Sequence, residues 1–557
     1  MMLLFLLLAS ITFFIFRPVF MANEVIIRYG VHPFDICSKN PDLWHWLKLL
    51  YVICFSFSSC ILAHFIYVRV FIHFSFFQAK KIPKSINDSS SVKNGLHLCI
   101  GEDLHHKKIL VPESGLYQNF LITGTIGSGK TSSAMYPFLK QLMEFNSCFP
   151  KKKIGMLILD VKGNFYQQVQ AYAKQFHLET DLIVLGLSSS VYYNPLHKPS
   201  LKPQVLANRL KNILLLFSEN NSESYWLDKA EEILTECIKL CRLYNNNYVT
   251  FLEIHKLVTV PHYYQQKIEI LRNLFLSSKL SHAQIYELNS SLDFFQKEFD
   301  CLDPRTKGIL VSEITRITNF FVSDFDVMSM FCAPLDKLSF TSFSEVLQKG
   351  KIVVLNMNLS EYASLSKIIS AYLKLDFQTE VISNLSRSCV KTSAFICDEY
   401  DKYANKSDAE FFSLSREAKC INIVSTQSYS SLKATLKDDA SVKVLIQNLI
   451  NKIWFRTDDI FTIEEAQKQL GKEEQERTSK SISESAKQTH FSYITNTLNS
   501  ENSNISETFS SYLQKDYKFD SNFFTQNLET FSALTFLSNG NQIFTPQKLL
   551  MLPYFKK

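Results

Sequence analysis

A glycine-rich loop is the part of this sequence whose residue types and spacing point most directly to chemistry. Residues 124–131 read Gly-Thr-Ile-Gly-Ser-Gly-Lys-Thr, which is the spacing of a phosphate-binding P-loop. The apolar run from Phe120 to Ile122 predicts a strand before the loop, and the residues after the loop are typical of a helix. This strand–loop–helix context favours a phosphate site over a glycine-rich turn that matches by chance.

Each part of the loop has a physical task. The glycines let the backbone approach a polyphosphate and turn its N–H groups inward, and the following helix adds its positive end. Lys130 would reach the β- and γ-phosphates of ATP, and Thr131 would ligate Mg²⁺. The residues expected to surround the nucleotide are Gly124, Thr125, Ile126, Gly127, Ser128, Gly129, Lys130 and Thr131.

An ATPase also needs a carboxylate beside the phosphates to hold Mg²⁺ and usually a second one to orient water. The pair Asp398-Glu399 follows the apolar residues Ala394 to Cys397, as expected at the end of a buried strand. We expect Asp398 to hold Mg²⁺ through water and Glu399 to polarise the attacking water. Strand ends often carry solvated acidic residues, so this pair indicates a metal site only in combination with the P-loop.

Two further polar residues are candidates for the same reaction. Gln427 follows the apolar segment from Ile421 to Val424, where it could sense the γ-phosphate or hold water; an ordinary turn glutamine fits the spacing equally well. Arg416 lies between Glu399 and Gln427, in a segment that we expect to be helical. In a ring such an arginine can reach a neighbour's γ-phosphate, although spacing alone favours a solvated arginine.

The elements that must position these residues alternate between strand and helix patterns, which indicates an α/β fold with a mostly parallel sheet. A long amphipathic helix is expected over about Tyr362–Ser383. The apolar strand candidates are Phe120–Ile122, Gly155–Asp160, Leu182–Leu185, Lys351–Met357, Ala394–Cys397, Ile421–Val424, Ile453–Phe455 and Ala533–Leu537.

Two segments interrupt this alternation. Helical periodicity without strand patterns predicts an all-α insertion over 201–335. Residues 201–330 hold 14 Lys/Arg and 16 Asp/Glu, so this insertion is not a basic DNA-gripping surface as a whole. The segment from about 472 to 520 is rich in Ser, Thr, Asn, Gln and charge, and we interpret it as a mobile surface insertion.

The totals set broad limits. The chain has 557 residues, enough for two or more domains, and a formal net charge of +6, which by itself does not indicate nucleic acid. The 12 cysteines include no Cys-x-x-Cys pair, which favours reduced thiols in a cytosolic body over disulfides or a zinc site. We expect a nucleotide-binding domain in two parts, 79–200 and 336–557.

The N-terminal 78 residues have the pattern of a membrane anchor with spans at about 2–20 and 46–68. A signal peptide is the alternative for the first run, and a buried core helix is the alternative for the second. Trp44 and Trp46 stand at the entrance of the second span, and basic residues follow it. The positive-inside rule then places residues from about 69 onward in the cytoplasm, with a short loop on the far side of the membrane.

At this point the sequence resembles the TraG/TraD-type coupling proteins of conjugation and type IV secretion, over most of its length. Family features include a proline in the helix after the P-loop, here Pro137. The other matching segments are Asp160-Val-Lys-Gly163, Tyr193-Asn-Pro-Leu196, Tyr225-Trp-Leu-Asp-Lys-Ala230 and Leu470-Gly471. Asp398, Glu399, Gln427 and Arg416 fall where the family has its Mg²⁺ carboxylate, catalytic glutamate, sensing glutamine and trans-acting arginine. Thr131-Ser132-Ser133 departs from the family, which often has a glycine soon after the P-loop lysine.

The resemblance implies a RecA-like ATPase domain and a homohexamer that drives its cargo into a secretion channel. The implied partners are single- or double-stranded DNA bound without sequence preference, a relaxase or secreted effector, and type IV secretion channel components. One alternative is a membrane receptor for protein cargo that uses nucleotide only as an assembly switch. A second alternative is another FtsK-like ring motor that translocates DNA.

Overall fold

The structure is a computed structural model that describes part of the chain. It describes Trp46 and residues 95–556 except 150–151, 188, 218–223, 277–280, 358, 387–389, 486–489, 493–496 and 500–503. The chain divides into two units, Met1–Asn94 and Gly95–Lys557. The expected membrane spans lie in the first unit, outside the described residues apart from Trp46. Within the described ranges, no helix is long and apolar enough to cross a membrane.

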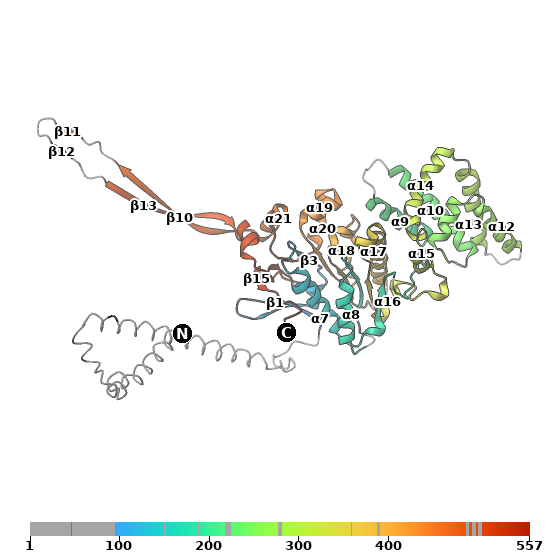
Figure 1. Ribbon diagram of the computed structural model, residues 1–557, viewed down its shortest axis with the longest axis horizontal. Helices are drawn as coiled ribbons and strands as arrows, with labels where there is room; N and C mark the ends of the chain where they lie inside the picture. The colour runs from blue at the N-terminus through green and yellow to red at the C-terminus, as the bar shows by residue number, and fades with distance from the viewer. Residues whose placement is uncertain are drawn as a thin grey trace, which may run out of the picture. The chain divides into compact units, whose positions relative to one another are not determined.

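The second unit is built on an 11-stranded sheet (Figure 1) with the strand order β2-β1-β15-β14-β9-β3-β8-β7-β4-β6-β5. The strands from β9 to β5 pair in parallel, and the strands from β2 to β9 pair antiparallel. The strands are β1 (His97–Glu102), β2 (Lys108–Pro112), β3 (Phe120–Thr123), β4 (Gly155–Leu159), β5 (Leu182–Leu185), β6 (Ile352–Leu355), β7 (Ser393–Cys397), β8 (Cys420–Thr426), β9 (Asn451–Trp454), β14 (Ser532–Phe536) and β15 (Gln547–Leu550).

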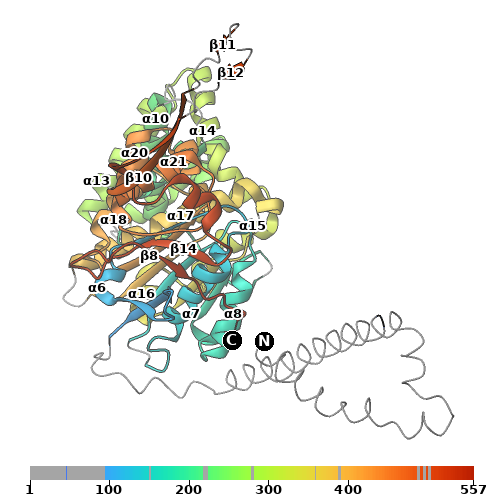
Figure 2. The same cartoon turned by 90° about the vertical axis from the view of Figure 1, so that its left-hand side faces the viewer.

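Both faces of the parallel part are covered by helices, because side chains of a strand alternate between its two faces. Phe120 and Ile122 of β3 join the apolar cluster that includes α7 and α8, whereas Leu121 joins the cluster on the opposite face. Figure 2 shows these layers from the side. The helices of the sheet domain are α6 (Glu113–Leu116), α7 (Tyr136–Glu144), α8 (Phe165–Gln175), α16 (Phe343–Lys349), α17 (Leu359–Ser383), α18 (Asp408–Leu414), α19 (Tyr429–Leu436), α20 (Asp439–Asn448) and α21 (Ile460–Leu470).

The eight predicted strands are all present, which confirms a mostly parallel sheet with many helices. A helix is present as α17 where one was expected, at about Tyr362–Ser383, but the expectation that it is amphipathic was wrong, because every residue from Ile368 to Gln378 is buried. Strands β1, β2 and β15 were not predicted from the sequence. They pair antiparallel at one side of the sheet, where half-exposed positions break the continuous apolar runs that identified the buried strands.

Between β5 and α16 the chain leaves the sheet and forms a separate set of helices. These are α9 (Pro203–Phe217), α10 (Ser224–Tyr244), α11 (Phe251–Thr259), α12 (Tyr263–Leu276), α13 (His282–Asp293), α14 (Pro304–Val322) and α15 (Phe325–Phe331). Side-chain hydrogen bonds cap the N-terminal ends of several of these helices. Asp303 accepts from the N–H groups of Arg305 and Thr306, and Ser281 forms a capping box with Gln284.

A buried carboxylate joins this helical region to the sheet domain. Asp376 of α17 accepts hydrogen bonds from Arg209 of α9 at 2.8 Å and from Tyr193 at 2.6 Å, and it pairs with Lys198 at 2.7 Å. Burial opposes the charge on Asp376, but the two cations outweigh it, and the pKa of Asp376 is lowered. Removing Asp376 would leave the buried Lys198 and Arg209 without their shared counter-charge, so this carboxylate is important for the junction.

The polar segment from about 472 to 520 contains a two-stranded ribbon. Strand β10 (Lys472–Ser485) pairs antiparallel with β13 (Asn504–Tyr517), and the short strands β11 (His490–Ser492) and β12 (Thr497–Asn499) also pair. In Figure 1 the ribbon extends away from the sheet domain. The sequence did not predict these strands, because Ser, Thr, Glu and Lys occupy both faces and leave no apolar alternation to recognise.

One lysine is buried in the sheet. Lys452 lies on β9, is 3% exposed, and has its Nζ 5.9 Å from the ring centre of Phe536. Burial lowers the pKa of Lys452 to about 8. Burial penalises the charged form of Lys452. The destabilisation that Lys452 causes is therefore greatest at pH values below its folded-state pKa, where the side chain is charged in the folded protein.

We predict that Lys452 contributes a rise in the free energy of unfolding between pH 8 and the ordinary lysine pKa of about 10.4, because its side chain binds more protons in the unfolded chain there. Lys452→Met should remove this rise and add on the order of 3 kcal/mol of stability at neutral pH. Lys452→Arg is the matched control, since it keeps its charge throughout and should gain no stability. Urea unfolding of the wild type and of Lys452→Met at several pH values measures this contribution as their difference, because buried thiols with raised pKa values, such as Cys397 and Cys420, change the stability of both proteins in the opposite direction. A difference that does not shrink from pH 8 to 10 would contradict the prediction.

Candidate nucleotide site

Three loops that carry the expected site residues leave the same edge of the sheet. Strand β8 lies between β3 and β7, and all three are parallel. Because the carboxyl ends of parallel strands face one edge, the P-loop after β3, Asp398 after β7 and Gln427 after β8 are brought together there. The sheet topology therefore assembles the site from distant segments, since Thr131 and Asp398 are 267 residues apart in sequence.

The P-loop backbone adopts conformations that require glycine at two positions. Gly127 has φ +77° and Gly129 has φ +100°. A Cβ on Gly129 would lie 2.6 Å from the ring of Phe531, whereas a Cβ on Gly127 would meet nothing within 4 Å. Inside the loop, the N–H and the hydroxyl of Ser128 both donate to the carbonyl of Thr125. The loop is thus a compact turn that packs closely against Phe531.

The helix after the loop begins with a π-turn over Thr131–Met135, and α7 continues from Tyr136. The N–H of Tyr136 donates to the carbonyl of Thr131, five residues earlier. Pro137, which we expected inside a helix, stands in the first turn of α7. The widened turn before it explains how the helix accommodates a residue that has no N–H to donate.

Lys130 is buried, and its ammonium group lies against the loop itself. It donates to the carbonyl of Thr125 at 3.1 Å and to the carbonyl of Gly124. Burial lowers the pKa of Lys130, and the nearby Asp398 opposes that shift. A side chain held in this way supplies a positive charge in a poorly hydrated place, which suits an anionic ligand.

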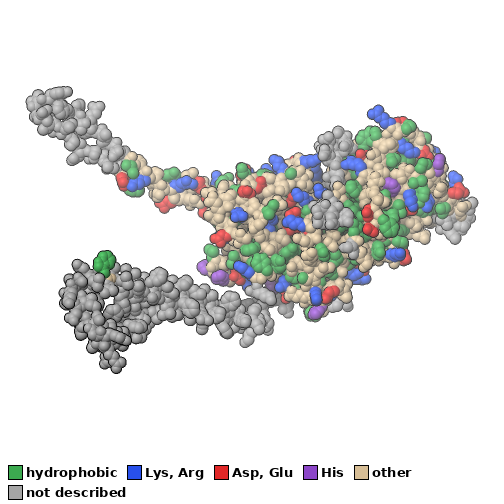
Figure 3. Space-filling view, in the orientation of Figure 1, with side chains coloured by type: hydrophobic (Ala, Val, Ile, Leu, Met, Phe, Trp, Pro, Cys, Tyr) green, Lys and Arg blue, Asp and Glu red, His purple; other side chains and the backbone are tan. Residues whose placement is uncertain are grey.

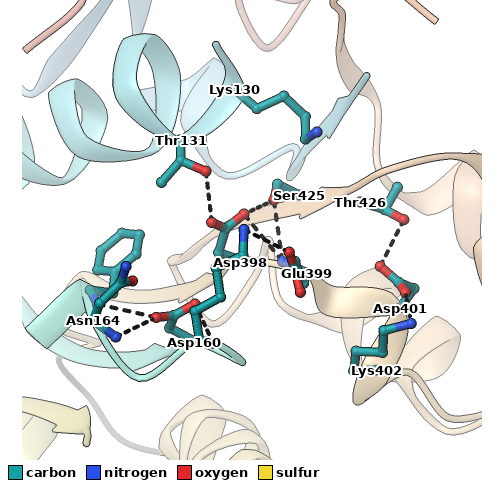
Figure 4. A network of polar contacts seen from close by, with 12 residues as sticks. Lys130, Thr131, Asp160, Asn164, Asp398, Glu399, Asp401, Lys402, Ser425 and Thr426 are labelled. Carbon is teal, nitrogen blue, oxygen red and sulfur yellow. Dashed lines mark hydrogen bonds and ion pairs between the residues drawn. The ribbon is translucent and has the colours of Figure 1, made fainter. Parts of the chain in front are cut away.

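Asp398, which directly follows β7, contacts both the helix after the P-loop and strand β8 (Figure 4). Its carboxylate accepts a hydrogen bond from the hydroxyl of Thr131 at 2.8 Å and another from the hydroxyl of Ser425 on β8. Thr131 and Asp398 are the two predicted metal-site residues, and the structure places them in direct contact. A magnesium ion prefers hydroxyl, carboxylate and water oxygens, so this donor set fits it.

Ser425 was not singled out by the sequence reasoning, which gave the site role in its segment to Gln427. The N–H of Glu399 donates to Asp398 at 3.2 Å and to the hydroxyl of Ser425 at 3.3 Å. Ser425 therefore orients both acidic residues. In the sequence, the feature that could have indicated Ser425 is its position directly after the apolar run of β8, at the same edge of the sheet as the P-loop.

Glu399 has a left-handed backbone, with φ +50°. Its carboxylate pairs with the ammonium group of Lys162 at 2.9 Å. Desolvation opposes the charge on Lys162, but the hydrogen bond and charge of Glu399 outweigh it, and the pKa of Lys162 is raised. Lys162 belongs to the Asp-x-Lys-Gly segment, whose part in the site was not assigned from sequence.

Asp160 of the same segment shapes the loop that carries Lys162. Its buried carboxylate accepts from the N–H groups of Lys162, Asn164 and Phe165, each at 3.1 Å. These bonds cap the start of α8 and fix the loop beside Asp398. Burial raises the pKa of Asp160, and the backbone hydrogen bonds work against that rise.

Gln427 and Arg416 lie at opposite ends of β8. Gln427 directly follows the strand, at the P-loop edge of the sheet. Arg416 is exposed, and it stands in the turn after α18, which ends at Leu414, so our expectation of a helical position was wrong. The turn opens β8 at its amino end, and the seven-residue strand separates the two residues by roughly 20 Å. Arg416 therefore cannot act on the site of its own chain.

The fold and loop define the chain as a P-loop protein with a RecA-like sheet. Residues 393–510 match the family model described as the TraM recognition site of TraD and TraG. This match includes Asp398, Glu399, Arg416, Ser425 and Gln427. The comparison of the sequence with curated proteins gave no significant match.

Solved structures of conjugative coupling proteins share the fold. TrwBdeltaN70 in an unbound form has 13% identity and a TM-score of 0.55, with 83% of this chain and 89% of that chain covered. Plasmid coupling protein TrwB with the GTP analogue GDPNP has 12% identity and a TM-score of 0.52, with 84% and 96% covered. TrwB with ADP and Mg²⁺ has 13% identity and a TM-score of 0.51, with 79% and 86% covered. Together, the family match and the shared fold support a TraG/TraD-type coupling protein.

We predict that Gly129→Ala disrupts the P-loop more than Gly127→Ala does. Both changes put a side chain at positive φ, which costs on the order of 1–2 kcal/mol. Only the alanine at position 129 also collides with Phe531. Urea unfolding should show the larger loss for Gly129→Ala, and ATP should raise its melting temperature little or not at all. Equal losses for the two variants would show that the packing against Phe531 is unimportant.

Proposed function

We propose that this chain is a membrane-anchored ATPase that couples ATP hydrolysis to the delivery of cargo into a type IV secretion or conjugation channel. The contact between Thr131 and Asp398 carries the proposal, because it joins the P-loop to the metal carboxylate of a hydrolytic site. The related TrwB structures with ADP and Mg²⁺ and with a non-hydrolysable ATP analogue support ATP and Mg²⁺ as the ligands.

Each residue of the site has a proposed role. The backbone of 124–131 holds the phosphates, Lys130 neutralises the β- and γ-oxygens, and Thr131 and Asp398 hold Mg²⁺. The ion, when bound, neutralises the charge that develops on the transferred phosphoryl group. Glu399 orients the attacking water and accepts its proton, and Gln427 holds that water or senses the γ-phosphate. The ion pair with Lys162 engages Oε1 of Glu399, so the other carboxylate oxygen would accept the proton while the pair holds the side chain in place.

The position of Arg416 supports a ring. An exposed arginine at the sheet edge opposite to the P-loop can reach a γ-phosphate only in another subunit. Its turn is held firmly, since the buried hydroxyl of Ser415 donates to Asn119 at 3.1 Å and accepts from Asn422 at 3.0 Å. We propose a homohexamer in which Arg416 of one subunit completes the site of the next.

The proposed cargo is a relaxase–DNA complex, a secreted effector, or both. The family model described as a TraM recognition site supports recruitment of relaxosome partners. On the face that Figure 3 shows, acidic and basic side chains are interspersed over the body. We propose that any DNA contact is made to backbone phosphates without sequence preference, because a pump must not stop at particular bases. The N-terminal apolar segments would anchor the protein in the bacterial inner membrane.

A nucleotide-switched receptor for protein cargo remains the second candidate. The ion pair between Lys162 and Glu399 favours it, because it engages one oxygen of the carboxylate that would otherwise serve as the base. This candidate keeps ATP binding but makes hydrolysis unimportant for delivery. The Glu399→Gln variant separates the two.

We predict that single-stranded DNA stimulates ATP hydrolysis by the full-length protein and that Lys130→Ala abolishes it. Glu399→Gln should lower turnover by about 10²–10³-fold while ATP stays bound, since it removes the group that accepts the proton. Phosphate release and ATP retention measure both effects. Cargo delivery at the wild-type level with Glu399→Gln would favour the switched receptor, and full hydrolysis by Lys130→Ala would refute the site.

We also predict that Arg416→Ala and Lys130→Ala are each inactive and that a mixture regains activity. In a random 1:1 ring, about a quarter of the sites would pair an intact Lys130 with an intact Arg416 from the neighbour. Phosphate release by the mixed assembly measures this, and Lys419→Ala, in the same exposed turn, is the control and should stay active. If Arg416→Ala alone hydrolyses ATP normally, the arginine has no role in a neighbouring site.

A further inference from the structure

Three aromatic side chains gather beside the P-loop from two segments far from it in sequence. Phe531 lies just before β14, and Tyr554 and Phe555 follow β15. The ring centres of Phe531 and Phe555 are 5.8 Å apart, and those of Tyr554 and Phe555 are 5.5 Å apart. Both pairs meet edge to face, a favourable arrangement that fixes the plane of the Phe555 ring.

Backbone hydrogen bonds tie this cluster to the loop. The N–H of Phe531 donates to the carbonyl of Ser128 at 3.2 Å, and the N–H of Tyr554 donates to the carbonyl of Ser132 at 2.9 Å. The ring of Tyr554 also packs against that of Tyr136, with 5.1 Å between their centres. The aromatic cluster therefore has a fixed place relative to the phosphate-binding residues.

The cluster keeps apolar surface in contact with water. Phe555 is 56% exposed and Tyr554 is 43% exposed, although both are held in ordered contacts. Phe531 has φ +66°, a conformation that is rare for a bulky side chain. Covering this exposed and fixed aromatic surface with a flat apolar ligand would be favourable.

The P-loop defines which part of a nucleotide would come close to this surface. In such a loop the lysine and the hydroxyl residue serve the β- and γ-phosphates and the metal, while backbone N–H groups hold the α- and β-phosphates. Because the α-phosphate carries the nucleoside, the base would extend from the side of the loop where these N–H groups lie, which includes the first helical turn at Ser132. The carbonyl of Ser132 is the group that anchors Tyr554.

We infer that Phe555, supported by Phe531 and Tyr554, is the stacking surface for the purine base of the bound nucleoside triphosphate. This inference rests on the proposed nucleotide site and assigns the base-binding part of it. A ring face attracts every base alike, so recognition by stacking distinguishes a nucleotide from a bare polyphosphate but hardly distinguishes adenine from guanine. ATP and GTP should bind with affinities within a few-fold of each other.

The test compares binding of Mg-ATP and of inorganic tripolyphosphate to the full-length protein by titration calorimetry. Phe555→Ala should weaken ATP binding by about five- to 150-fold, as expected for the loss of one base–aromatic stack, and should leave tripolyphosphate binding unchanged. Phe555→Trp should retain ATP binding. Phe325→Ala, which removes a 75% exposed phenylalanine in the helical region, is the matched control and should change neither.

The other outcomes are also decisive. Equal weakening of ATP and tripolyphosphate by Phe555→Ala would show that Phe555 only supports the P-loop, and unchanged ATP binding would place the base elsewhere; either result overturns the inference. Failure of the nucleotide site itself is seen separately, since Lys130→Ala should then leave binding of both ligands intact. A preference of more than about 100-fold for ATP over GTP would require hydrogen bonds to the base edge and would also overturn stacking as the mode of recognition.

Discussion

The hydrogen bond between Thr131 and Asp398 depends on the register of three parallel strands. Val424 of β8 is aligned with Cys397 of β7, and Thr426 of β8 is aligned with Thr123 of β3. This alignment sets Ser425 beside Asp398 and sets the start of the P-loop at the same level. A shift of one residue in either pairing would turn the side chains to the opposite face and separate the carboxylate from both hydroxyl groups. The buried apolar faces of the strands therefore hold the polar site in place.

Charge in the site is balanced between buried groups of opposite sign. Burial raises the pKa of Asp160 and lowers that of Lys130, so each environment penalises the charged form. The penalty on Asp160 is offset by three backbone N–H groups, and that on Lys130 is opposed by Asp398. Such a site is prepared to exchange internal contacts for a charged ligand, because the groups are already positioned and little reorganisation is needed.

The sequence predicted the parts of the fold whose residues are buried on both sides. Continuous apolar runs such as those of β4 and β7 are recognisable without a structure, and the P-loop adds a motif with a known context. The sequence could not show that Lys162 pairs with Glu399 or that Ser425 contacts Asp398, because these contacts join separate strands. It also placed Arg416 in a helix, since the turn after Leu414 carries neither glycine nor proline to mark the helix end.

The helical region begins and ends at neighbouring strands of the sheet. Strands β5 and β6 pair directly, with Leu182 aligned with Ile352, and all helices from α9 to α15 lie in the connection between them. In topological terms the region is one crossover of a parallel sheet that has grown to the size of a domain. A crossover can be lengthened, shortened or replaced without altering the order of the strands. The helical region can thus change during evolution while the strands that assemble the nucleotide site stay unchanged.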